Sequence, residues 1–285
     1  RCNVDTDSGA AHAAELGIHG VGLFRTEFLY IGREAPPDED AQRLEYAAAL
    51  AAFKNQPVVI RTMDFGADKF DARVNAPKEP NPFLRLRGIR LTFELPDLLR
   101  TQLRAILRAS PNGSVQIMFP MINDLGEFRR AKAYVEQVKR ELRAEKIPFD
   151  ATTPVGAMIE TPSAALQAES ILREADFLSL GTNDLTQYAL AVDRTNAKVS
   201  NLFKPHHPAV CRLIKATVAA GRAAGKPVAV CGEMAGTPRY VGLLLGLGLR
   251  ALSCAPTRVR DVVDRVRRLD IDECEELAAR VLGAE

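Results

Sequence analysis

Short apolar runs that suit buried strands recur along the chain, and segments with helical spacing separate nearly all of them. These runs lie near residues 2, 20, 57, 115, 154, 176, 227 and 251. The run at 57–64 is apolar on both faces, as expected for a parallel strand that is covered on both sides. Eight parallel strands with helices between them are what a closed barrel requires, so the pattern predicts an α/β fold of the (β/α)8 TIM-barrel class.

Helical spacing is clearest in two segments, residues 38–53 and 124–142. Asp38 is expected to cap the first helix, on which Leu44, Ala48 and Ala51 share one face. The pair Asp124 and Glu127 has the spacing of a capping box for the second helix. Its apolar stripe consists of Phe128, Ala131, Val135, Val138 and Leu142. A third helical stretch, 81–110, is expected to break near Pro96, and residues 258–283 predict one final helix or a pair.

Unusual side chains gather at the downstream ends of the predicted strands. They are Arg25, Arg61, Pro120, Glu160, Asn183, Asp184 and Cys231. In barrel enzymes this end of the strands carries the active site. The distribution therefore predicts one functional face.

Two acids follow consecutive predicted strands. Glu160 closes the strand near 154, and Asp184 follows the strand near 176. Carboxylates in equivalent positions of neighbouring strand-helix units can converge on a hard divalent cation such as Mg²⁺. Glu160 could instead cap the next helix, although Thr161 already supplies a cap. Asp184 fits a capping box with Gln187 equally well, and one carboxylate can serve both roles.

Arginines accompany these acids. Arg25 and Arg61 each follow an apolar strand in an R-T context, and Arg87 and Arg194 are further candidates. A single arginine at the end of a strand more often forms a surface ion pair. Several arginines together suit a small polyanion, because guanidinium groups bind phosphate and carboxylate groups in bidentate fashion. Four others read as solvated helix charges: Arg85, Arg90, Arg100 and Arg104.

Cys231 lies at the mouth of its strand before a glycine, in VCGEMAG. A strand cysteine is usually an inert small hydrophobe. Near several arginines, however, its thiolate would be stabilised and the thiol could donate or accept a proton. Cys254 lacks such a motif and is expected in the core. The adjacent His206 and His207 have proline neighbours and predict a loop rather than a metal site.

Composition narrows the class of protein. The 285 residues are 47% hydrophobic and 26% charged, with a formal charge of +2, so net charge favours neither nucleic acid nor membrane partners. Five cysteines without CxxC spacing predict reduced thiols. No signal peptide or membrane-length apolar run is found, which predicts a cytoplasmic protein. The abrupt first strand suggests a domain of something longer.

Six motifs in order carry a specific resemblance that covers most of the chain. They are GVGLFRTEFLY, VVIRTMDFGADK, NPFLRLRGIR, MIETPSAA, LSLGTNDLTQYALAVDR and VCGEMAG. Together they resemble the phosphoenolpyruvate (PEP)-binding domain of Enzyme I of the bacterial PEP-dependent sugar phosphotransferase system. The resemblance implies that residues 1–285 form one PEP-binding barrel domain and that the N-terminal phosphohistidine domain is absent from this chain.

The resemblance also implies roles for residues. Glu160 and Asp184 would hold Mg²⁺, and Cys231 would protonate the enolate carbon to release pyruvate. PEP would be bound by Arg25, Arg61, Arg87, Asn183, Asp184 and Arg194, with Lys69 a weaker candidate. The phosphoryl group would pass to a histidine of the N-terminal domain and then to the carrier protein HPr, and the domain would form a homodimer.

The sequence departs from the pattern of the Enzyme I family at two points, and other families share some of its motifs. Arg85 stands where the family commonly has glycine, and no histidine in the family's threonine-serine-histidine setting occurs in the 285 residues. The nitrogen-related paralogue of Enzyme I is equally compatible with the motifs. Pyruvate, phosphate dikinase and PEP synthase share this barrel, although the R-T-E-F-L-Y wording favours Enzyme I. A non-catalytic module that senses PEP is the alternative from another class.

Overall fold

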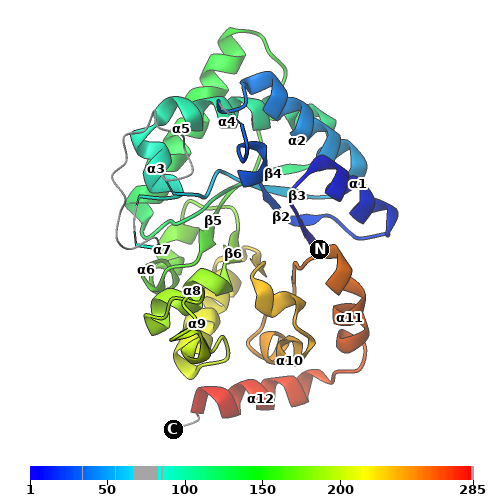
Figure 1. The fold of residues 1–285 in the computed structure, drawn as a ribbon, viewed down its shortest axis with the longest axis vertical. Coiled ribbons are helices and arrows are strands. Elements are labelled where there is room, and N and C mark those ends of the chain that lie inside the picture. Colours follow the sequence, from blue (N-terminus) through cyan, green and yellow to red (C-terminus); the bar gives the residue numbers. More distant parts are fainter. Residues whose placement is uncertain (34, 55, 67–82, 85, 284–285) are drawn as a thin grey trace. The chain divides into compact units, whose positions relative to one another are not determined.

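The computed structural model describes residues 1–33, 35–54, 56–66, 83–84 and 86–283. The chain folds as two compact units, each with its own strands and helices (Figure 1). Unit 1 comprises Arg1–Asn3, Ile122–Phe128 and Gly156–Glu285, and unit 2 comprises Val4–Met121 and Arg129–Val155.

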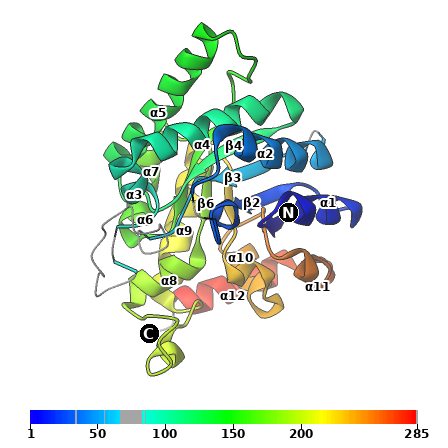
Figure 2. The ribbon, with the colours of Figure 1, turned by 45° about the horizontal axis from the view of Figure 1, so that its top comes forward.

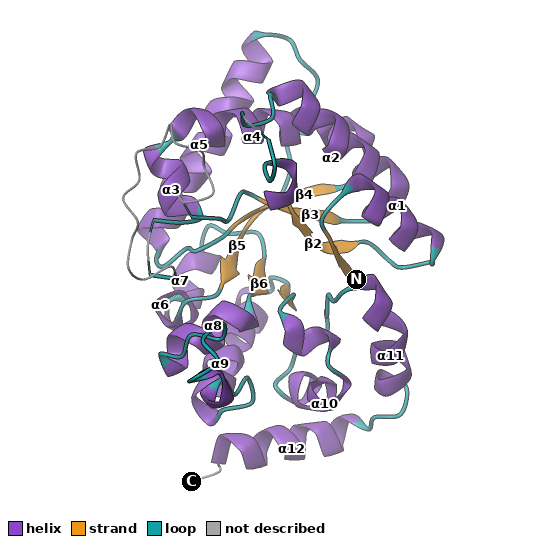
Figure 3. Cartoon of the chain, viewed as in Figure 1, coloured by secondary structure: helices purple, strands orange, loops and turns teal. Residues whose placement is uncertain are grey.

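Unit 2 alternates strands with helices. In chain order its elements are α1 (Asp7–Glu15), β2 (Val21–Arg25), the 3-10 helix η1 (Glu27–Leu29), α2 (Glu39–Phe53), β3 (Val58–Arg61), α3 (Ile89–Glu94), α4 (Pro96–Ala109), η3 (Ser110–Asn112) and β4 (Val115–Phe119), followed by most of α5 (Leu125–Ala144). Helix α2 packs against α1 and α4, and the strands lie inside this helical layer (Figure 3). The predicted break at Pro96 is confirmed, because α3 ends at Glu94 and α4 begins with the proline.

Unit 1 repeats the same alternation. Its elements are β5 (Val155–Ile159), α6 (Pro162–Leu166), α7 (Ala168–Leu172), β6 (Leu178–Leu180), α8 (Thr182–Leu190), η4 (Ser200–Leu202), α9 (Pro208–Ala224), β7 (Val228–Val230), η5 (Glu233–Gly236), α10 (Pro238–Gly246), α11 (Pro256–Val266) and α12 (Ile271–Gly283). Helices α10 and α12 pack side by side (Figures 1 and 2). The charged carboxyl-terminal segment, residues 258–283, forms two helices, α11 and α12, which is one of the two predicted outcomes.

The strands of each unit pair in parallel. In unit 2, β3 lies between β2 and β4, and in unit 1, β6 lies between β5 and β7. The eighth strand predicted near residue 251 does not form: Leu252 makes only a single parallel bridge to Val230, and Cys254 makes one to Cys2 of β1 (Cys2–Val4). Parallel strands joined through helices are the pattern of the (β/α) barrel, so the predicted fold class is confirmed.

Helix α5 has the predicted core face. Phe128, Ala131, Val135, Val138 and Leu142 have no exposed surface. The Glu127 N–H donates to Oδ1 of Asp124 at 2.8 Å, as the capping box predicts. The Glu127 carboxylate reaches one residue further back than predicted and accepts from the Asn123 N–H at 2.7 Å. Helical periodicity and cap chemistry thus agree at this helix.

Helix α2 begins after the predicted cap, Asp38, but buries a different face from the predicted one. Leu44 is 60% exposed, and Ala48 and Ala51 also face solvent. The buried side chains are Gln42, Tyr46, Ala49, Leu50 and Phe53. The prediction is wrong because it weighed aliphatic side chains alone. Gln42 is buried, and its Oε1 accepts a hydrogen bond from the Tyr46 hydroxyl at 3.2 Å, which satisfies both groups in the core.

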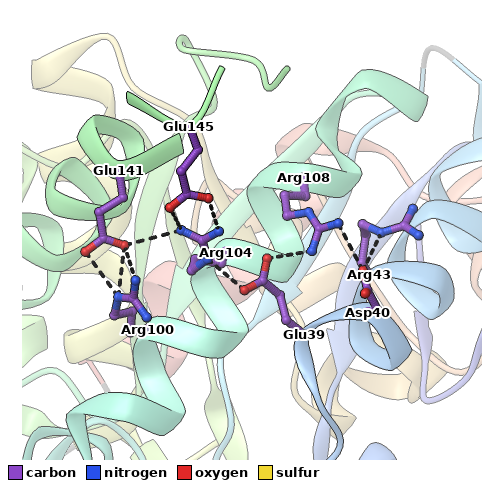
Figure 4. Close-up of polar contacts among 8 residues, drawn as sticks. All are labelled: Glu39, Asp40, Arg43, Arg100, Arg104, Arg108, Glu141 and Glu145. Carbon is purple, nitrogen blue, oxygen red and sulfur yellow. Dashed lines mark hydrogen bonds and ion pairs between the residues drawn. The ribbon is translucent and has the colours of Figure 1, made fainter. Parts of the chain in front are cut away.

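Charged side chains join α2, α4 and α5 in one network (Figure 4). Its members are Glu39, Asp40, Arg43, Arg100, Arg104, Arg108, Glu141 and Glu145. Arg104 is only 7% exposed, and it donates to Glu39 at 2.7 Å and to Glu145 at 2.6 Å. The prediction of a solvated helix charge is therefore wrong for Arg104. Sequence spacing on α4 alone could not reveal acids contributed by two other helices.

We expect Arg104→Met to lower the free energy of unfolding by about 2 kcal/mol, between the effects typical of exposed and of buried ion pairs. The change leaves Glu39, Glu141 and Glu145 without their shared cation. Arg100→Met is the matched control, because the Arg100 side chain is 41% exposed and its loss should cost less than about 1 kcal/mol. Urea unfolding measures both, and equal losses would contradict the central role of Arg104.

The same variant should show a pH dependence of defined sign. Hydrogen bonds from Arg104 lower the pKa of Glu145 below its ordinary value of 4.5. Burial raises the pKa of Glu141, but hydrogen bonds from Arg100 and its neighbours lower it overall. Carboxylates with a depressed folded-state pKa stabilise fully above the unfolded-state pKa. The difference between wild type and Arg104→Met should therefore shrink as the pH falls below 4.5.

All five cysteines are free and buried, as predicted for reduced thiols. Among the described residues no helix combines the length and apolarity needed to cross a membrane.

Candidate functional site

Arg25 and Arg61 end neighbouring strands of unit 2. Arg25 is the last residue of β2 and Arg61 the last of β3, and the two are direct partners in the parallel register. Matching R-T motifs in the sequence thus become adjacent positions at the same edge of the sheet. The prediction that these two arginines share the downstream edge of their strands is confirmed.

Two acids fix the guanidinium group of Arg61. Its Nη2 donates to Oε1 of Glu27 at 2.7 Å, and its Nη1 lies 2.9 Å from Oδ2 of Asp64. Arg87 binds the same carboxylate with two nitrogens, at 2.8 and 3.2 Å. Asp64 is 8% exposed, so one buried carboxylate orients two arginines. Bidentate pairing of this kind fixes the plane of a guanidinium group.

The backbone leaves room for this arrangement at Gly88. Its φ is +56°, and a Cβ there would lie 3.0 Å from Oδ1 of Asp64. A larger residue after Arg87 would press on the carboxylate that holds both arginines, in a conformation that side-chain-bearing residues seldom adopt. The glycine in the R-G-I motif is therefore explained by close approach.

Arg25 has another partner. Its Nη2 donates to Oδ2 of Asp5 at 3.0 Å, and its side chain is 46% exposed. Asp5, Glu27 and Asp64 were not predicted as partners of the arginines. Glu27 and Asp64 do lie within the two R-T motifs, which is the signal that could have indicated them. Asp5 offers no such signal because it comes from another segment.

Glu160 and Asp184 meet within unit 1. Glu160 follows β5 directly and is 1% exposed, and Asp184 lies in the first turn of α8. A carboxylate oxygen of each lies within 4.8 Å of the other, a spacing that one divalent cation can bridge. A Cβ on Gly181 would lie 2.9 Å from Oε2 of Glu160, so a glycine is needed beside this carboxylate. This acidic pair could hold a metal ion.

The capping alternatives are settled by where the helices begin. Thr161 caps α6, accepting from the Ala164 N–H at 3.2 Å, so Glu160 is not needed as a cap. Helix α8 begins at Thr182 after Gly181, which places Asp184 inside the first turn rather than at the N-cap. The capping box of Asp184 with Gln187 is therefore wrong.

Asn183 and Arg194 lie near Asp184 through separate contacts. Asn183 and Glu233 bind each other reciprocally: Asn183 Nδ2 donates to Glu233 Oε1 at 3.1 Å, and the Glu233 N–H donates to Asn183 Oδ1 at 3.0 Å. Arg194 Nη2 lies 3.7 Å from Oδ1 of Asp184. Unit 1 thus brings together the predicted acids, Asn183 and the predicted arginine at the beginning of α8.

Cys231 follows β7 and is 4% exposed. Its Sγ lies 3.3 Å from Oγ of Ser179 and 3.6 Å from the carbonyl oxygen of Leu180. Asn3 Nδ2 donates to the Cys231 carbonyl oxygen at 2.9 Å, which fixes the backbone. Ser179 was not predicted, because a serine inside a buried strand carries no motif of its own. Cys254 is buried as predicted.

Two of the positions named from the sequence, Lys69 and Arg85, lie outside the described residues.

Comparisons with known proteins identify relatives of this chain. Residues 1–271 match the family model described as "PEP-utilising enzyme, PEP-binding domain". The chain is similar to the phosphoenolpyruvate-protein phosphotransferase of Priestia megaterium, with 45% identity over 96% of this chain and 48% of that protein. The Geobacillus stearothermophilus protein of the same name is 44% identical, over 99% and 49%. The chain therefore spans about half the length of the curated relatives it matches.

Solved structures show the same fold at low identity. A citrate lyase from Burkholderia xenovorans superposes with a TM-score of 0.59 at 19% identity, over 99% of this chain and 81% of that one. The malate synthase of Haloferax volcanii, in a magnesium and glyoxylate complex, gives a TM-score of 0.54 at 14% identity, over 84% and 65%. At these identities the likeness concerns the fold alone.

Proposed function

Because the chain belongs to the family of PEP-binding domains of PEP-utilising enzymes, we propose that it is the PEP-binding part of a phosphoenolpyruvate-protein phosphotransferase. The observation that carries this proposal is the 45% identity to a protein of that name over 96% of the chain. The reaction would be the transfer of the phosphoryl group of PEP to a histidine outside this chain, with release of pyruvate.

Charge balance supports the assignment of roles. PEP carries about two negative charges on its phosphoryl group and another on its carboxylate. Arg25, Arg61 and Arg194 would bind these oxygens, with Asn183 and Asp184 completing the contacts and Arg87 supporting the phosphate side. The glutamate and aspartate of unit 1 fit Mg²⁺ because both are carboxylates, within 4.8 Å of each other. When bound, the ion would offset charge on the phosphoryl and carboxylate oxygens.

Cys231 would complete the reaction. When the bond between phosphorus and the enolate oxygen breaks, the phosphoryl group passes to the acceptor histidine and the enolate is left behind. The enolate carbon takes the proton of the Cys231 thiol, which gives pyruvate and a thiolate. The Ser179 hydroxyl, 3.3 Å from Sγ, can donate to that thiolate.

The proposed partners are those that the resemblance to Enzyme I implies. The acceptor histidine would lie in an N-terminal domain, from which an HPr-like carrier would receive the phosphoryl group. The domain would work as a cytoplasmic homodimer. A PEP synthase or dikinase is less supported, because relatives at 44–45% identity are named phosphoenolpyruvate-protein phosphotransferases. A sensing module would bind PEP without enolate chemistry, which the cysteine variant described in the Discussion tests.

The proposal predicts magnesium-dependent binding of PEP by this chain. Isothermal titration calorimetry should show binding at least about 10-fold tighter with Mg²⁺ than with a chelator. Acids of the chain already pair with the three arginines, so the metal supplies positive charge that the arginines do not. Inorganic phosphate is the control ligand and should bind more weakly, because it lacks the carboxylate. An absence of heat with PEP and Mg²⁺ would overturn the site.

A further inference from the structure

Helix α8 and the loop after it contain buried nitrogen atoms that donate no hydrogen bond to any atom of the described residues. Two of these atoms are Nε2 of Gln187 and Nη1 of Arg194. Gln187 is only 4% exposed. Burying a donor without an acceptor is costly, so such a group requires an acceptor from beyond the described residues, either a ligand or a water molecule. Gln187 has no role in the function proposed above.

The other end of the Gln187 amide is already occupied. Its Oε1 accepts a hydrogen bond from the Arg194 N–H at 3.2 Å. The chain returns to Gln187 because Ala191, which follows α8, is in the left-handed conformation and the Val192 N–H donates to the Gln187 carbonyl oxygen. This fixes the amide orientation, since a flip would set the NH2 group against another donor. Nε2 is therefore the end left for a ligand.

Gln187 shares a helix face with the residues that bind PEP in the proposed function. Asn183 and Asp184 precede it by four and three residues, and residues at these spacings lie on the same side of an α-helix. Arg194, whose backbone Gln187 holds, places Nη2 3.7 Å from Oδ1 of Asp184. The unsatisfied amide thus lies one turn along α8 from the acid and beside the arginine.

We propose that Gln187 is a further ligand-binding residue: its Nε2 donates a hydrogen bond to an oxygen of the anionic group that Arg194 binds. The inference rests on the proposed function and names an additional contact for the same ligand. The oxygen belongs to a phosphoryl or a carboxylate group, which offer the same acceptor chemistry. Oε1 meanwhile holds the Arg194 backbone, so one amide serves both loop and ligand.

Two substitutions separate these roles. Gln187→Glu keeps an acceptor for the Arg194 N–H but replaces the donor with a negative oxygen, whereas Gln187→Met keeps the volume and loses both. We expect PEP binding with Mg²⁺ to weaken about 10-fold in the methionine variant and about 100-fold in the glutamate variant, because a carboxylate repels the anion. Binding by Gln187→Glu that equals wild type would overturn the proposal, since holding Arg194 would then be the whole role.

Gln167 supplies matched controls in the same unit. Its Nε2 donates to the Asn123 carbonyl at 3.3 Å and to Ser163 Oγ at 3.1 Å, so its amide is satisfied within the chain. Gln167→Glu and Gln167→Met should bind PEP within about twofold of wild type. A loss in these variants equal to that at Gln187 would overturn a specific contact at Gln187.

A measurement on the wild-type chain tests the same contact even if the Gln187 variants do not fold. Titration with PEP and Mg²⁺ should shift the side-chain amide resonances of Gln187 in a nitrogen-hydrogen correlation spectrum. Pyruvate with Mg²⁺ causes the same shift if the acceptor is the carboxylate, and none if it is the phosphoryl group. Unchanged Gln187 resonances at saturating PEP would overturn the contact. A wild-type chain that binds no PEP would instead overturn the proposed function, and the ligand of Gln187 with it.

Discussion

Replacing Cys231 with alanine is expected to abolish pyruvate formation from PEP in the full-length protein while leaving PEP binding within about threefold of wild type. The thiol would act after the phosphoryl group has left, so its loss removes the proton donor and not a ligand contact. General acids of this kind contribute about 10²- to 10⁴-fold to a rate. Steady-state pyruvate production and calorimetry on the same variant measure the two effects separately.

The surroundings of Cys231 explain why its loss should abolish pyruvate formation but leave PEP binding nearly unchanged. The side chain is 4% exposed, and alanine can replace it without leaving a charge unpaired. The backbone is held through the Cys231 carbonyl oxygen, which accepts from Asn3, and through the Cys231 N–H, which donates to Leu180. Neither contact uses the thiol. The strand end should therefore keep its shape in the variant.

Cys254→Ala is the matched control. Cys254 is equally buried at 4%, and burial raises the pKa of its thiol, so it remains a neutral thiol. Pyruvate formation should survive its removal. In the chain itself, exchange of pyruvate methyl hydrogens with deuterated water should require Cys231 and not Cys254. Loss of PEP binding equal to the loss of turnover in Cys231→Ala would show that the cysteine has been given the wrong role.

The positions of the side chains at strand ends could be predicted from the sequence, because they follow from the position and direction of each strand. Carboxyl ends of parallel strands share an edge, so the motifs of Arg25 and Arg61 predicted that both lie on one face, although not that they are direct register partners. The same rule indicated Glu160 as the residue that closes β5. These predictions required only strand positions and direction, which hydrophobic runs reveal well.

The partners of those residues were not predictable in the same way. Arg104 reads as solvated on α4, yet acids from two other helices surround it. The buried face of α2 includes Gln42, whose Oε1 accepts a hydrogen bond from the hydroxyl of Tyr30, outside that helix, at 3.2 Å. Polar groups are buried when distant segments supply complementary atoms. Such pairs have no period along the chain, which is why Ser179 beside Cys231 was also missed.

The second large effect is expected from the acidic pair, Glu160 and Asp184, and concerns PEP binding in the presence of Mg²⁺. Asp184→Asn is expected to weaken PEP binding in the presence of Mg²⁺ by about 100-fold, or about 2.7 kcal/mol, while binding without the metal changes little or improves. Asparagine keeps the shape of the side chain but removes the charge that a hard cation requires. It also removes the anionic partner 3.7 Å from Arg194, which leaves that guanidinium free to attract the ligand.

A double-substitution cycle shows whether both acids serve one ion. Glu160→Gln alone should cause a similar loss, and the double variant should lose little more than either single one, because a site without its cation has no further metal-dependent affinity to lose. Asp193→Asn is the control: this carboxylate binds the Thr195 backbone and hydroxyl, and asparagine keeps that acceptor. Fully additive losses at Glu160 and Asp184 would mean that the two carboxylates act separately, and the shared magnesium site would have to be abandoned.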